Sequence, residues 1–204
     1  MKLLKILHLL VILTLIGLAG PGAPDARADA PEATVQQLLK TLNKMHHRKP
    51  LTPAQQQSND AISRQALAHL DVRQVSEKTL GKYWKQRSVK EQEAFVKLLG
   101  SLFQTVAFPS SAKFFGEMKI TYAPTEATGT QATVPLKVLH EQEGEVGIAF
   151  VLAQNSSRWR VVDVVLDGVS MRNNLRTQFY KVIQKHDYAE LVRRMQKKLD
   201  DTKK

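Results

Sequence analysis

The chain has 204 residues, with 30 lysines and arginines against 19 aspartates and glutamates, a net charge of +11, and no cysteine. The lack of cysteine excludes disulfides, thiol catalysis, thiolate metal sites and a lipid-modified cysteine anchor. The length fits one domain. The basic excess favours acidic partners such as lipid phosphates, or serves solubility alone.

The N-terminus has the pattern of an export signal. A basic start precedes an apolar run at residues 6–19, too short for the ~18 residues of a membrane span, and small residues then offer cleavage sites. We expect residues 1–28 to be a signal peptide, cleaved near Ala28 or Ala30, and residues 29–204 to form a single soluble domain.

Helical patterns come first in the mature chain. Apolar spacing predicts an amphipathic helix from Glu32 to Met45. The polar segment 46–60 contains two prolines and predicts a loop. A weaker helix follows through residues 62–70, and another from Val72 to Trp84.

A stronger helix follows. Ser88 and Glu91 form a capping box, in which each side chain satisfies a backbone N–H group at the helix start. An apolar stripe from Phe95 to Val106 marks this helix as central to the core, and Pro109 is expected to end it.

The period then changes to that of strands. Residues 117–124, 131–140, 145–154 and 158–167 are strand-length runs separated by polar or glycine-bearing turns, which predicts an antiparallel meander. Pro135 lacks a backbone N–H group, so we expect its strand to lie at an edge or to contain a bulge.

Two helices close the chain. Ser170 is placed to cap the first, and Asp187 with Glu190 opens the second. The chain therefore predicts an α+β fold: a four-stranded antiparallel meander packed with N-terminal helices and with two C-terminal helices that fold back on it.

The segment Asp167-Gly168-Val169-Ser170 does not support catalysis. A nucleophile elbow needs a second glycine after the serine, and Met171 and Arg172 follow here. Asp163 and Asp167 would lie about 13 Å apart on a strand, beyond the separation of a glycosidase pair. Asp163 is better explained as a buried hydrogen-bond acceptor. The five histidines of the mature chain show no metal-binding spacing, so we predict no enzyme, no metal and no cofactor.

The third strand has two apolar faces of different size, which predicts that both are covered. The small face leaves room for a closely packed helix or for an apolar ligand, and the residues alone favour the helix. The bulky face consists of Val146, Ile148, Phe150 and Leu152, and the small face of Gly147, Ala149, Val151 and Ala153.

Two segments, LGKYWKQRSVKEQEAFVKLLGSLF and RWRVVDVVLDGVSMRNNLRTQFYKVI, carry a family resemblance. Its most specific part is Trp159, Val161 and Asp163 ahead of DGVS. With the export signal and the meander, residues 80–199 resemble the MlaC-type, toluene-tolerance family of periplasmic phospholipid-binding proteins.

The resemblance implies an apolar lipid pocket between the sheet and the helices, with DGVS as the turn at its mouth. The resemblance therefore favours a bound ligand over a packed helix on the small face of the third strand, because that face would line the pocket. The lipid-binding residues that it implies are Leu99, Phe103, Phe108, Phe115, Val134, Leu136, Ala149, Val151, Val165, Val169, Ser170, Leu175 and Phe179.

The implied function is that of a monomeric periplasmic carrier in outer-membrane lipid asymmetry. It would shuttle phospholipid between an inner-membrane ABC transporter with a lipid-binding ring and an outer-membrane lipoprotein complex, without contact with nucleic acid. A hopanoid-associated carrier and a periplasmic adaptor without ligand are the alternatives. A set of basic residues would dock the partner complexes or lipid headgroups, or would form a solvated helix face. These residues are Arg172, Arg176, Arg193, Arg194, Lys197 and Lys198.

Overall fold

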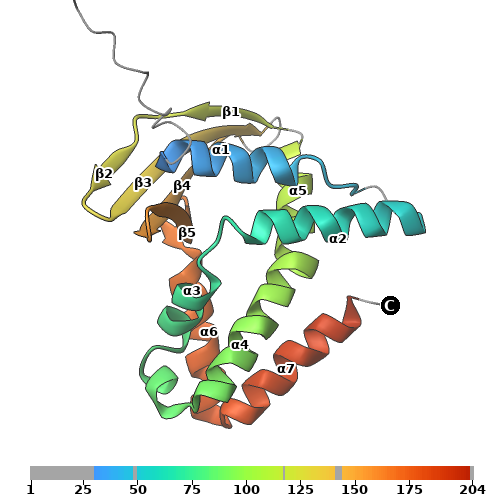
Figure 1. The fold of residues 1–204 in the computed structure, drawn as a ribbon, viewed down its shortest axis with the longest axis vertical. Helices are drawn as coiled ribbons and strands as arrows, with labels where there is room; N and C mark the ends of the chain where they lie inside the picture. Colours follow the sequence, from blue (N-terminus) through green and yellow to red (C-terminus); the bar gives the residue numbers. More distant parts are fainter. Residues whose placement is uncertain (1–29, 48–49, 117, 141–143, 203–204) are drawn as a thin grey trace, which may run out of the picture.

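The structure, a computed structural model, describes residues 30–47, 50–116, 118–140 and 144–202; the predicted signal peptide lies outside them. A twisted sheet carries α1 and α2 across one side, and the long α4–α5 helix runs from the sheet to a second group of helices (Figure 1). The N-terminal helices are α1 (Pro31–Leu42), α2 (Pro53–Leu67), α3 (Val72–Leu80), the 3-10 helix η1 (Gly81–Gln86), α4 (Val89–Leu102), the π-helix η2 (Phe103–Ala107) and α5 (Phe108–Gly116). The rest are β1 (Lys119–Tyr122), β2 (Glu126–Thr128), β3 (Gln131–His140), β4 (Gly144–Asn155), β5 (Arg158–Leu166), β6 (Val169–Ser170), α6 (Met171–Lys185) and α7 (Tyr188–Asp201).

The predicted α+β class and meander are confirmed. The sheet has the order β1-β3-β4-β5-β6, every neighbouring pair is antiparallel, and β2 pairs with β3 beside β1. The four predicted runs become β1, β3, β4 and β5, while the short β2 and β6 were not foreseen. Asp167 and Gly168 both have positive φ, of 44° and 81°, as a two-residue hairpin turn between β5 and β6 requires.

Pro135 lies in an interior strand, so the predicted edge or bulge at this position is wrong. On one side of β3, β1 pairs from Leu136 onward and β2 pairs only as far as Thr133. Pro135 falls in the gap between them, and its carbonyl accepts a hydrogen bond from Ala123 N at 2.9 Å. An N–H group at residue 135 would point into the same gap, where no strand pairs with it. The proline therefore costs the sheet no hydrogen bond.

Two of the helix boundaries that differ from the prediction lie next to prolines. The expected loop at 46–60 contains the start of α2, because Thr52 and Gln55 form a capping box and Pro53 occupies the first helical turn, where no N–H group is needed. Pro109 does not end its helix. The preceding residues form the π-helix η2, whose wider turn accommodates a proline that an α-helical turn would reject.

The interior contains two apolar cores. The first core lies between the sheet and α1, α2 and α5; the second joins α3, η1, α4, α6 and α7. Phe103 contacts both cores from η2. The prediction that both C-terminal helices fold back on the sheet is wrong for α7, which packs against α4 and α6 instead.

The two faces of β4 have different environments. Ile148, Phe150 and Leu152 are buried against the first core. On the opposite face, which we call the outer face, Gly147 is exposed and Ala149, Val151 and Ala153 are half-buried. The expectation that both faces are covered is therefore wrong for the described residues, because the helices of the first core pack on the bulky face only.

Adjacent residues of β4 provide a matched test of this difference. Phe150→Ala leaves a cavity in the first core, and we expect it to lower the free energy of unfolding by about 3–5 kcal/mol. Ala149→Trp places its indole on the outer face, and we expect a change of about 0.5 kcal/mol or less. Denaturant titration measures both. Equal losses in the two variants would mean that the outer face is covered in solution.

Candidate binding groove

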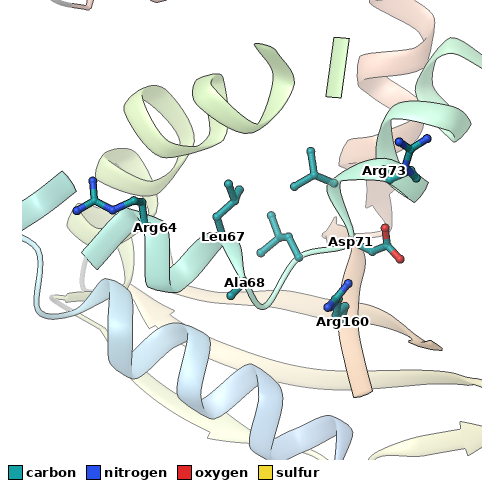
Figure 2. A pocket seen from close by; sticks show the side chains of 8 residues that line it. Arg64, Leu67, Ala68, Asp71, Arg73 and Arg160 are labelled. Atoms are coloured by element: carbon teal, nitrogen blue, oxygen red, sulfur yellow. The ribbon is translucent and has the colours of Figure 1, made fainter. Parts of the chain in front are cut away.

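An open groove of about 390 Å³ lies where α2 gives way to α3 beside β5 (Figure 2). This volume is in the range of small-molecule sites, roughly 300–1,000 Å³. The lining combines apolar side chains in the middle with charged ones toward the ends. The groove is formed by Arg64 and Leu67 of α2, Ala68, Leu70 and Asp71 of the connecting segment, Val72 and Arg73 of α3, and Arg160 of β5.

The segment between α2 and α3 is held to β5 by backbone hydrogen bonds. Asp71 N donates to the Val161 carbonyl at 3.0 Å, and Val161 N donates to the His69 carbonyl at 2.8 Å. Leu70 and Val161 thus form a short parallel bridge that places Arg160 beside the segment. Burial lowers the pKa of His69 below its usual value, which favours the neutral imidazole in the folded protein.

The groove lies over the seam between the two cores. Leu67 and Leu70 pack against the first core, and Val72 packs against the second. Gly100 of α4 approaches from below: a Cβ atom there would lie 3.5 Å from Leu67 Cδ2 and 3.7 Å from Val72 Cγ1.

Asp163 organises the junction between the sheet and α6. The residue is 6% exposed, and its carboxylate accepts hydrogen bonds from Val164 N at 2.8 Å, Ser170 Oγ at 2.6 Å and Arg172 N at 2.9 Å. Arg172 Nη2 also lies 3.6 Å from Asp163 Oδ2. Ser170 Oγ in turn accepts from Asn173 N at 3.0 Å and caps α6. The predicted roles of Asp163 and Ser170 as acceptor and cap are confirmed.

A family model described as MlaC protein matches residues 32–197. The chain belongs to the MlaC family. Over 137 residues it is 24% identical to the intermembrane phospholipid transport system binding protein MlaC of Haemophilus influenzae, a match that covers 64% of this chain and 63% of that protein. The chain thus spans less than two thirds of the length of this relative.

The fold is also similar to a solved structure. A phospholipid-binding protein from Ralstonia solanacearum, determined in complex with a phospholipid, superposes with a TM-score of 0.69 at 19% identity. The match covers 89% of this chain and all of that chain. The predicted resemblance to the MlaC family is therefore confirmed by the family model.

The structure does not gather the predicted lipid-binding residues of this MlaC-family chain in one place. One group lies in the first core, one in the second, and one on the outer face and the β5–β6 hairpin. The first-core residues are Phe108, Phe115, Val134 and Leu136, the second-core residues are Leu99, Leu175 and Phe179, and Phe103 touches both. Ala149, Val151 and Val165 share the outer face, and Val169 and Ser170 lie on the hairpin.

None of these thirteen residues lines the groove, which sequence reasoning missed. Most groove residues fall at the end of a weakly amphipathic helix, in a short connecting segment and at the start of the next helix, where no motif is visible. A signal did exist in the arginines Arg64, Arg73 and Arg160, but they lie on three separate elements that only the fold brings together.

Most of the basic residues expected to dock partners have internal contacts. Arg193 and Arg194 both bind the Glu190 carboxylate, at 2.6 and 2.7 Å, and these hydrogen bonds lower the pKa of Glu190 to about 2. Arg172 pairs with Asp163, and Arg176 lies over the Tyr180 ring. These contacts indicate that structural roles account for part of the basic charge.

The residues that the structure describes contain neither a metal-binding cluster nor a helix that could span a membrane. Within them, no cluster of histidine, cysteine, aspartate or glutamate could hold a metal ion. No helix in the same ranges is long and apolar enough to span a membrane.

Proposed function

We propose that this chain is a periplasmic phospholipid carrier, exported by the signal at residues 1–28 and cleaved near Ala28 or Ala30, and that residues 29–204 form one lipid-binding domain. Family membership and the fold shared with a phospholipid-binding protein support this proposal. It is a carrier rather than an enzyme, and shuttles lipid between an inner-membrane ABC transporter with a lipid-binding ring and an outer-membrane lipoprotein complex.

The observation that carries the proposal is the groove over the seam between two cores. Acyl chains would enter between the α2–α3 segment and α4, and separate Leu67 and Val72 from Gly100. Phe103, which contacts both cores from the π-helix, would then line the path. π-helical turns are frequent at functional sites, and this one lies where the long helix passes between the cores.

The energetics suit a carrier. Burial of apolar surface contributes about 25 cal/mol per Å², so the acyl chains themselves supply most of the binding free energy. Partial opening of the seam would expose apolar side chains of both cores to the ligand, and closure after release would bury them again. No covalent step is needed.

Native mass spectrometry of protein purified without detergent tests the proposal. We expect a bound mass that organic extraction identifies as phospholipid. A triterpenoid in the extract would support the hopanoid alternative instead. Protein that carries no lipid, and takes none from vesicles, would contradict the carrier function and support the alternative of a periplasmic adaptor without ligand.

A further inference from the structure

The groove carries an excess of positive charge. Three guanidinium groups, of Arg64, Arg73 and Arg160, share it with one carboxylate, of Asp71. Figure 2 shows Arg64 at one end, Asp71, Arg73 and Arg160 at the other, and Leu67 and Ala68 between them. The surface is therefore amphipathic, with apolar side chains flanked by cationic ends.

The three guanidinium groups are available to a ligand. In the described parts of the chain, Arg64, Arg73 and Arg160 take part in no side-chain ion pair, whereas Arg87 and Arg172 are paired with carboxylates. The carboxylate of Asp71 has a different task, because its Oδ1 accepts from Gln74 N at 2.9 Å and caps α3. It does not neutralise either neighbouring arginine by direct contact.

We propose that this groove binds the phosphate of an anionic lipid headgroup, and that the carrier prefers such lipids to zwitterionic ones. Guanidinium forms bidentate hydrogen bonds to phosphate oxygens. The three guanidinium groups would also repel the quaternary ammonium of a zwitterionic headgroup, and this repulsion supplies the preference for an anionic headgroup. The apolar middle of the groove accommodates the glycerol and the first methylene groups. The inference rests on the proposed function, since it names the ligand class of the same site.

Lipid uptake from mixed vesicles tests this preference. The protein is stripped of lipid and incubated with vesicles of equal phosphatidylglycerol and phosphatidylcholine at 0.15 M salt, and bound lipids are counted by mass spectrometry. We expect an excess of phosphatidylglycerol, and a fall of about tenfold in that ratio for Arg73→Gln with Arg160→Gln, two arginines at the same end of the groove, from the loss of charge-assisted hydrogen bonds.

Two variants serve as controls. Arg158→Gln removes an exposed charge two residues before Arg160, outside the groove lining, and should change the ratio far less than the double variant because it removes no hydrogen bond to a phosphate in the groove. Asp71→Asn should raise the ratio, since it removes the negative charge while asparagine still caps α3. Circular dichroism confirms that each variant is folded.

The outcomes separate this inference from the proposed function. A ratio that stays the same in the double arginine variant, or a fall in the ratio of Asp71→Asn, would overturn the anionic headgroup site while carriage of lipid stands. Inhibition of lipid uptake by glycerol 3-phosphate at the same concentration as the lipid would show that the groove binds free phosphate esters. This result would overturn the proposal that the groove binds a lipid headgroup. Failure of the wild-type protein to take up either lipid would refute the carrier itself.

Discussion

Oxidised Val72→Cys/Gly100→Cys is expected to exchange phospholipid more slowly than the wild-type protein by about tenfold or more, and a reducing agent is expected to restore exchange. The chain contains no cysteine, so the pair would be the only thiols present. A Cβ atom at residue 100 lies 3.7 Å from Val72 Cγ1, close to the ~3 Å that separates Sγ from the opposite Cβ in a disulfide. The bond would fasten the α2–α3 segment to α4 and hold the seam closed.

Fluorescent-lipid transfer between vesicles measures this effect, with the bond confirmed by mass spectrometry. The two single-cysteine variants are matched controls and should transfer lipid at the wild-type rate in both redox states. Wild-type transfer by the oxidised double variant would exclude entry of acyl chains beneath the α2–α3 segment. Lipid would then have to reach the interior elsewhere, for instance between the sheet and α1.

Asp163→Ala is expected to lower the free energy of unfolding by about 3–5 kcal/mol, because it removes a buried carboxylate that accepts three hydrogen bonds. The change leaves Val164 N, Ser170 Oγ and Arg172 N without their acceptor, and leaves the Arg172 guanidinium without its carboxylate. These groups fix the start of α6, whose Phe179 belongs to the second core. The loss should therefore spread from the hairpin to the helices.

Asp167→Asn is the matched control, four residues further along. Asp167 is exposed, has a φ of 44° and accepts from Gly147 N at 2.9 Å. Asparagine tolerates this backbone conformation and offers an amide oxygen, so thermal unfolding should change little. An Asp163→Ala protein that unfolds at the same temperature as the wild type would show that the hydrogen bonds to Asp163 contribute no stability.

The sequence alone determined the elements whose signals are local. The capping box of Ser88 and Glu91, the turn at Asp167-Gly168 and the cap at Ser170 depend on residues a few positions apart, and all are present. The family resemblance rested on the same local patterns. Local patterns gave wrong predictions at two prolines. Pro135 is tolerated inside the sheet because the neighbouring strands leave a gap beside it, and Pro109 is tolerated inside a helix because it follows a π-helical turn.

Tertiary structure decided which apolar faces are buried and where a ligand could enter. Gly147 to Ala153 show two apolar faces in sequence, but only the positions of α1, α2 and α5 decide which one is covered. The groove depends on Arg64, Arg73 and Arg160 from three elements, and on an approach between Gly100 and Leu67 across 33 positions. Periodicity reports the environment of one helix or strand, whereas a seam between two cores is set by how separate elements pack.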